Sequence, residues 1–324
     1  MMKAVLVFID GTICDERQRY HLGIGTPEFY RREEMLKDVA VPGSVQCLQE
    51  LAQQYTLVYI GARPVATLPY TEEWLDKSGF PKGHICLGET QAERLVLVRE
   101  LREKFDFVAG IGDRWDDNEL HLEIGCSSII LQEHAGDWIS VPQRILKHRR
   151  EQKIKENEVR LQGKAEGLAR VLPRLHAKYG DDLWEAHFES VMNMAVTSCE
   201  ARAKEDLESF ATHGLDPTDL HAAAKWIEVT REEDWESDPA FGLQDFAIVE
   251  ATRQRLVMKV TRCRYAELWR EHGRTDIGYQ IHCRCDAAWW DRPAWNSKVR
   301  FEQPKTLMRG DDSCLFVQYL PDNP

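Results

Sequence analysis

Residues 1 to 135 alternate short apolar runs with segments of helical character, and this alternation restricts the possible folds more than any other feature of the sequence. The apolar runs are AVLVFI, TLVYI, HICLG, FVAGIGD and SSIILQ, and between them lie SVQCLQELAQQ, TEEWLDKSG and ERLVLVRELREKF. Strands that alternate with helices predict a parallel sheet with helices on both faces. We therefore expect an α/β domain over residues 1–140.

The pattern changes after residue 140. A strongly charged segment with few apolar residues follows, and it predicts a linking helix over residues 141–180. Amphipathic helices come next. Strands return only after residue 245, in DFAIVEATRQRLVMKVTRC and KVRFEQPKTLMRGDDSCLFVQYL, each of which is typical of two strands around a polar turn. Residues 181–324 are thus expected to form an α+β domain, with helices followed by an antiparallel sheet.

The composition of the chain limits the classes of partner that it can bind. Lys and Arg total 42 against 54 Asp and Glu, a formal net charge of −12, which argues against a diffuse surface for nucleic acid. No stretch has the roughly 18 to 20 apolar residues of a membrane span, and the sequence opens with no signal-peptide pattern. We expect a cytoplasmic protein that binds a small molecule, and neither nucleic acid nor membrane. Its nine cysteines are expected to be thiols, and its oligomeric state is left open.

The first apolar run delivers Asp10, Gly11 and Thr12 to its carboxyl end, where α/β sheets place ligands. FIDGT resembles the first motif of the haloacid dehalogenase-like phosphatases, Asp-x-Asp-Gly-Thr. GARP, at residues 61–64, is similar to the Thr-Gly/Ala-Arg-Pro motif of the polynucleotide-kinase 3'-phosphatase branch, and GIGDRWDDNEL resembles the acidic fourth motif. The resemblance implies this family's fold and a magnesium site at Asp10, Asp113 and Asp117.

Two positions depart from that family's pattern. Phe8 occupies the place of the nucleophilic aspartate, and Gly61 occupies the place of the hydroxyl of the second motif. A phenylalanine can neither attack phosphorus nor bind a hard cation, which needs oxygen ligands. We expect a domain that keeps the fold and has lost the reaction. The alternative is a magnesium-dependent phosphatase that acts through Asp10 and Asp113.

Four of the cysteines lie near the carboxy terminus, and three of them fall in informative places. Cys263 lies where a strand pattern gives way to a helical one, and a helix amino terminus lowers the pKa of a thiol. A strand that ends near Cys283, followed by the helix DAAWW, would direct Cys283 and Asp286 toward one pocket and leave Cys285 as a core thiol. Cys314 lies on the last predicted strand.

Three segments, VTRCRYAELWREHG, IGYQIHCRCDAAWW and PKTLMRGDDSCLF, together resemble the L-2-amino-thiazoline-4-carboxylic acid hydrolase family. The resemblance implies hydrolytic opening of a small ring. Water adds to the amidine-like C2 of the thiazoline, the ring C–S bond breaks, and N-carbamoyl-L-cysteine results. This chemistry needs a nucleophile or an activated water, a proton carrier and support for the tetrahedral centre.

The candidates for these roles are Cys263 or Cys283 as nucleophile, Asp286 as base or orienting acid, and His282 as a helper, with Cys314 nearby. The candidate substrate-binding residues are Thr306, Gly310, Asp311 and Trp289. Alternatively, the three thiols and Asp286 could hold zinc or another divalent metal that activates water.

Two classes of function follow. The first is a hydrolase that opens a cyclic C–N or C–S bond of the thiazoline or amidine type by Cys/Asp chemistry. The second is a non-catalytic small-molecule or metal-binding module joined to a degenerate phosphatase domain. His187 and His221 lie on amphipathic helices and are expected to be structural.

Overall fold

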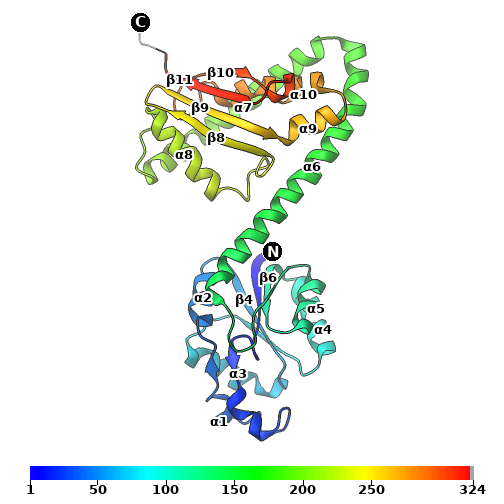
Figure 1. Cartoon of the computed structure of the whole chain (residues 1–324), viewed down its shortest axis with the longest axis vertical. Coiled ribbons are helices and arrows are strands. Elements are labelled where there is room, and N and C mark those ends of the chain that lie inside the picture. Colours follow the sequence, from blue (N-terminus) through cyan, green and yellow to red (C-terminus); the bar gives the residue numbers. More distant parts are fainter. Residues whose placement is uncertain (322–324) are drawn as a thin grey trace. The chain divides into compact units, whose positions relative to one another are not determined.

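The structure is a computed structural model that describes residues 1–321 (Figure 1). The chain forms two compact units, Met1–Arg149 and Arg150–Pro324, and their boundary falls within helix α6 (Val141–Tyr179). The three-part division at residues 140 and 180 stays a prediction.

The first unit is built on a parallel sheet of five strands in the order β5-β4-β1-β6-β7. The strands are β1 (Met2–Phe8), β4 (Thr56–Gly61), β5 (His84–Leu87), β6 (Phe105–Gly112) and β7 (Ser127–Ile130). A short antiparallel pair, β2 (Cys14–Asp15) and β3 (Val39–Ala40), and the short helix α1 (Arg32–Met35) follow β1. The predicted parallel α/β architecture is confirmed.

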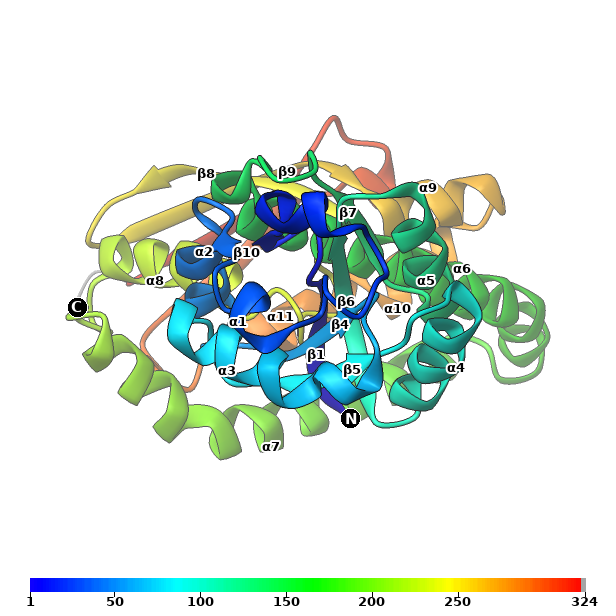
Figure 2. The same cartoon turned by 90° about the horizontal axis from the view of Figure 1, so that it is seen from below.

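Helices cover both faces of this sheet, as Figures 1 and 2 show. Helices α2 (Ser44–Leu51) and α3 (Leu68–Ser78) pack on one face, and α4 (Gln91–Arg102) and α5 (Trp115–Ile124) pack on the other. Because side chains alternate along a strand, Val5 and Val7 of β1 enter the core under α2 and α3, whereas Leu6 and Phe8 enter the core under α4 and α5. This alternation decides where Phe8 points.

The second unit has helices first and an antiparallel sheet last, as the sequence predicts. Its helices α7 (Asp182–Thr212) and α8 (Leu220–Glu233) precede a four-stranded sheet in the order β10-β11-β9-β8. The strands are β8 (Gln244–Ala251), β9 (Arg255–Cys263), β10 (Arg300–Lys305) and β11 (Cys314–Tyr319). Between β9 and β10 lie α9 (Arg264–Glu271), α10 (Thr275–Ile281) and α11 (Asp286–Trp290).

One local prediction was wrong. The segment before Cys283 is helix α10 and not a strand, and Cys283–Cys285 forms a single 3₁₀ turn that leads into α11. The helix is favoured because Gly278 lets α10 approach α9 closely: a Cβ at Gly278 would lie 2.5 Å from the ring of Trp269. The predicted helix DAAWW and both hairpins are confirmed.

Two further findings concern residues 1–321 as a whole. All nine cysteines are free thiols. No helix in this part of the chain combines the length and the apolar character that crossing a membrane requires.

Candidate functional site

Phe8, in the place of the phosphatase nucleophile, is part of the hydrophobic core. Its side chain is buried together with Leu6, Val98 and Leu120, and its ring packs edge-on against that of His121, with centroids 5.5 Å apart. The position therefore holds a packing side chain that is directed away from any ligand at the carboxyl end of the sheet.

Asp10 is neutralised by two buried arginines. Its Oδ1 accepts a hydrogen bond from Arg63 at 2.7 Å and lies 3.9 Å from Arg19. Burial alone would raise the pKa of Asp10, but the two guanidinium groups hold this pKa below its ordinary value. Because Arg63 is hydrogen-bonded to the carboxylate and Arg19 lies close to it, Asp10 is poorly suited to bind a further cation such as magnesium.

The other two predicted metal ligands are engaged as well. Asp113 accepts a hydrogen bond from the Thr12 hydroxyl, and Oδ2 of Asp117 accepts the backbone N–H groups of Asp113 and Arg114, both at 3.0 Å. Burial raises the pKa of Asp113 to about 7 and that of Asp117 to about 6. One oxygen each of Asp10 and Asp113 is buried without a hydrogen-bond partner, although Nε of Arg114 lies 3.7 Å from that of Asp113. Asp10, however, is already paired with two arginines, and Phe8 stands where the phosphatase motif has a carboxylate. The residues present therefore do not fit the magnesium site of those phosphatases.

Convergent metal ligands are scarce in the described part of the chain. Within residues 1–321, three His, Cys, Asp or Glu side chains bring ligand atoms within 4.8 Å of one another only at Asp10, Cys14 and Glu16. Arg63 donates to the Cys14 sulfur at 3.3 Å, and burial raises the pKa of this thiol. The predicted zinc set of three thiols and Asp286 does not converge in this way.

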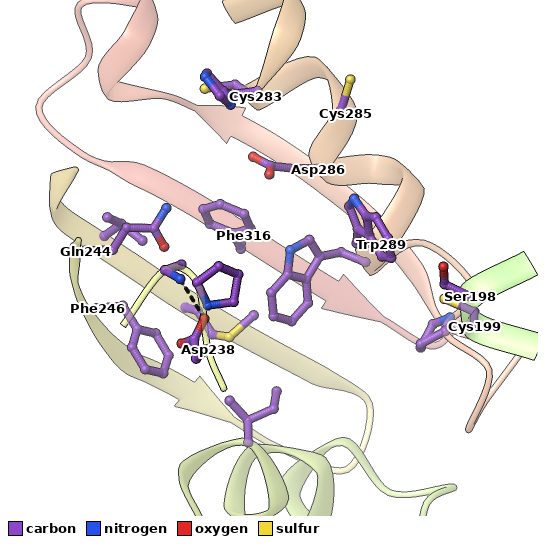
Figure 3. A pocket seen from close by; sticks show the side chains of 18 of the residues that line it. Ser198, Cys199, Asp238, Gln244, Phe246, Cys283, Cys285, Asp286, Trp289 and Phe316 are labelled. Carbon is purple, nitrogen blue, oxygen red and sulfur yellow. Dashed lines mark hydrogen bonds between the residues drawn. The ribbon is translucent and has the colours of Figure 1, made fainter. Parts of the chain in front are cut away.

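The second unit contains a cavity of about 850 Å³. Its floor is one face of the antiparallel sheet, with Phe246, Met258, Val260 and Phe316, and its walls come from α7, α8 and α11. Figure 3 shows the carboxylate of Asp286 extending from α11 over the strand that carries Phe316. Of the predicted residues, the cavity is lined by Cys263, His282, Cys283, Asp286, Trp289 and Cys314. The structure thus brings six of the nine together.

Cys263 caps the amino terminus of α9, as its place between strand and helix predicts. Burial nevertheless raises the pKa of its thiol, and the backbone N–H groups of Ala266 and Tyr265 offset this only in part. The expected lowering of the Cys263 pKa was wrong, because the loss of solvent outweighs the field of a two-turn helix.

Thr306 joins two of the thiols. Its hydroxyl lies 3.4 Å from the sulfur of Cys283 and 3.7 Å from that of Cys314, which also accepts the backbone N–H of Leu307 at 3.2 Å. Burial raises the pKa of both thiols, for Cys283 well above its ordinary value. Both thiols are therefore protonated at neutral pH.

Asp286 begins α11, and its carboxylate reaches the cavity. Gln303 of β10 donates to its Oδ2 at 2.9 Å. Burial raises the pKa of Asp286 and the hydrogen bond from Gln303 lowers it in part, so that the pKa is about 7. A carboxyl group with such a pKa can both accept and return a proton near neutral pH.

Two histidines lie beside these groups. Burial, together with the nearby Lys164 and His187, lowers the pKa of His282 to about 3, so the ring is neutral at pH 7. His187 also lines the cavity, and its Nε2 is buried without a partner. The sequence predicts only a structural role for His187 and not its place in the cavity, because no signal in the sequence links α7 to the later segments. His221 lies outside the lining, against the carbonyl of Ala251 at 3.2 Å.

Three of the predicted substrate-binding residues do not line the cavity. Thr306 supports the thiols instead. Asp311 accepts the backbone N–H of Thr306 at 2.8 Å, and Gly310 ends the 3₁₀ turn Leu307–Arg309 with a φ of +93°, which favours glycine. The role of these three residues in substrate binding stays a prediction. Trp289, by contrast, is partly exposed at the cavity wall (Figure 3). Gln303, which bonds to Asp286, belongs to no motif, and no signal in the sequence marks it.

The rate at which Cys263 and Cys283 are alkylated depends on their thiol pKa values. Because burial raises the thiol pKa of Cys263 and Cys283, we expect both to react slowly with iodoacetamide at pH 7 and about tenfold faster per pH unit above it. Peptide mass spectrometry of the folded protein measures each site. The partly exposed Cys199 serves as the internal reference. Rapid alkylation of Cys283 at pH 7 would show a thiolate and contradict the raised pKa.

Several solved structures and one family model are each similar to part of this chain. Similar solved structures include the Pnkp1/Rnl/Hen1 RNA repair complex, with 18% identity, a TM-score of 0.35, and 42% of this chain and 44% of that chain covered. A class C acid phosphatase from Bacillus anthracis with tungstate bound has 21% identity, a TM-score of 0.33, and coverage of 43% and 70%. A haloacid dehalogenase-like hydrolase from Streptococcus pneumoniae has 14% identity, a TM-score of 0.35, and coverage of 46% and 90%.

The chain spans less than half of the RNA repair protein that it matches. A search of curated proteins gave no significant match. Residues 170–317 match a family model. This range includes every residue that lines the cavity except Lys164 and Gln318. That model describes the L-2-amino-thiazoline-4-carboxylic acid hydrolase family. The match confirms that the carboxy-terminal segments resemble this family.

Proposed function

We propose that the second unit is a hydrolase that opens a small cyclic amidine of the thiazoline type, with Asp286 as the proton carrier. The observation that carries the proposal is the placement of Asp286. Its carboxyl group lines a cavity of about 850 Å³, and its pKa of about 7 lies at the operating pH of a general base. The family match of residues 170–317 supports the hydrolytic reaction class.

An activated water accounts for the geometry better than a cysteine nucleophile. The thiolate is the nucleophilic form of cysteine, and burial disfavours it at Cys263, Cys283 and Cys314. The negative charge of Asp286 raises the Cys283 pKa further. We therefore assign the attack to water and give Cys283 a place in the cavity wall.

The reaction can be written with Asp286 as the one protein group that carries a proton, while solvent supplies and takes back a second proton. The carboxylate takes a proton from water as the oxygen bonds to the amidine carbon C2, and the ring nitrogen takes up the electron pair together with a proton from solvent. The C2–S bond then breaks, and the sulfur receives the proton that Asp286 holds. After loss of one proton to solvent, the product carries a carbamoyl group and a free thiol, and it differs from the substrate by one water.

The test is to incubate the full chain with 2-amino-thiazoline-4-carboxylate and to follow the product by mass spectrometry. We expect a product that is heavier by one water, and we expect Cys283→Ser to keep most of the rate. Loss of activity in Cys283→Ser, together with a trapped protein–substrate adduct on the wild-type chain, would replace the water route by a covalent one. Recovery of unaltered substrate would overturn the hydrolase proposal.

The pH dependence follows from the state of Asp286. The base must be ionised, and its pKa in the folded protein is about 7. We therefore expect kcat/KM to fall about tenfold per pH unit below pH 7 and to level off above it. Initial rates from pH 5 to 9 measure this profile. A profile that is flat through pH 7 would remove Asp286 from the rate-determining proton transfer.

A further inference from the structure

A second charged group of the cavity, Arg231 on α8, has no acidic partner. The guanidinium group lines the cavity and is partly buried. Within residues 1–321, no carboxylate lies within 4.0 Å of it, and it donates no hydrogen bond. Asp238 and Glu232 act on Arg231 only at longer range, and burial lowers the pKa of the guanidinium group. Its five N–H donors are thus available to a ligand.

The nearby acidic groups are used elsewhere. Asp238 accepts the backbone N–H of Ala240 at 2.8 Å, as the dashed line in Figure 3 shows. Glu232 pairs with Arg150 at 2.5 Å. The other arginine of the cavity, Arg202, has its own partner in Asp206 at 3.7 Å. Arg231 is therefore the cavity arginine whose charge the fold leaves unpaired.

Phe246 fixes the orientation of this cation. The guanidinium carbon of Arg231 lies 4.0 Å from the centroid of the Phe246 ring. Stacking of this kind holds the guanidinium plane and leaves its N–H edges for a planar anion, and a carboxylate fits such an edge with two parallel hydrogen bonds. Figure 3 shows Phe246 and Asp286 on different sides of the cavity, so a ligand between them could contact both groups.

A second unpaired polar atom lies in the cavity lining. Gln318 follows Cys314 and Phe316 along the inward face of β11, and only 1% of its surface is exposed. Its amide N–H donates to the carbonyl of Trp290 at 2.8 Å, whereas its Oε1 is buried without a partner. A buried acceptor without a donor is costly, and the N–H group of an amidine would supply that donor.

We propose that Arg231 determines substrate specificity by binding a carboxylate of the substrate, and that Gln318 accepts an N–H of its amidine group. This assignment rests on the proposed function, because it names the polar ends of the molecule that Asp286 would hydrolyse. The substrate class is then an acid with a cyclic amidine, and the aromatic walls cover the part between these ends.

The test compares two probes, 2-amino-thiazoline-4-carboxylate and 2-amino-thiazoline, which lacks the carboxyl group. In the full chain, Arg231→Gln should raise KM for the acid about 10- to 100-fold, the effect of losing a charge-assisted hydrogen bond, and should leave kcat nearly unchanged. The same substitution should not change KM for the probe without the carboxylate. Arg231→Lys should fall between wild type and Arg231→Gln, because it keeps the charge and loses the paired hydrogen bonds.

The matched control is Arg255→Gln, an arginine outside the cavity that pairs with Glu250 at 3.2 Å. It should leave both KM values unchanged. Equal KM values for the acid in wild type and Arg231→Gln, with both proteins folded, would overturn the assignment. Direct binding by calorimetry separates the two proposals: if the wild type binds the acid through Arg231 without turnover, the hydrolase proposal fails and the assignment of Arg231 stands.

Discussion

Asp286→Asn is expected to lower kcat for thiazoline opening by about 10²- to 10⁴-fold, the contribution of a positioned general base. The amide keeps the size of the side chain, and it can still bond to Gln303, which holds Oδ2 of Asp286 at 2.9 Å. It cannot accept the proton of water. Product formation by mass spectrometry, under saturating 2-amino-thiazoline-4-carboxylate, measures the loss.

Two controls separate chemistry from folding. Asp312→Asn changes an exposed carboxylate outside the cavity, paired with Lys305 at 3.2 Å, and should retain the wild-type rate. The raised pKa of Asp286 also means that the folded protein binds more protons than the unfolded chain between the ordinary pKa of 3.8 and about 7. Stability from this group is therefore lost as the pH rises through that window. Asp286→Asn should melt no lower than wild type at pH 8, so an inactive and unfolded variant would not support the role.

Arg19→Met is expected to destabilise the first unit by about 3 to 5 kcal/mol, the cost of leaving one partner of a buried ion pair alone. Arg19 and Asp38 are almost completely buried, and Nε of Arg19 lies 2.9 and 3.1 Å from the two oxygens of Asp38. Arg19 also donates to the carbonyl of Phe29 at 2.9 Å. Urea unfolding measures the lost free energy of unfolding, and hydrogen exchange in peptides from β1 and β4 assigns that loss to the first unit.

Arg17→Met is the matched control, because Arg17 forms an exposed pair with Asp15 at 2.6 Å. Solvent and salt screen exposed pairs, which contribute little to stability, so this variant should unfold close to wild type. If Arg19→Met also lost less than about 1 kcal/mol, solvent would have to reach Asp38 in the folded protein, contrary to its burial.

Much of the fold was predictable because it follows from short-range patterns. Apolar runs such as TLVYI became buried parallel strands, and the polar turns between paired runs became hairpins. The exception, helix α10, depends on a contact with α9 that is made through Gly278. Such a contact between separate elements has no trace in the periodicity of the seven residues Thr275–Ile281.

Site residues that belong to a sequence motif were predictable. Site residues that only the tertiary structure brings to the cavity were not. Cys283 and Asp286 lie in the cavity because the 3₁₀ turn and α11 put both on one side. Gln303, Arg231 and His187 come from three distant elements, and no motif marks them. The thiol pKa values also escaped prediction, since burial depends on the completed tertiary structure and outweighed the local helix effect at Cys263.

The burial of Phe8 has a consequence for any carboxylate placed at this position. Its ring packs beside Leu6, Leu120 and His121, so Phe8→Asp would bury an unpaired charge and leave a cavity in the core. A carboxylate at position 8 therefore requires compensating substitutions among its neighbours, and Phe8→Asp alone is expected to destabilise the first unit.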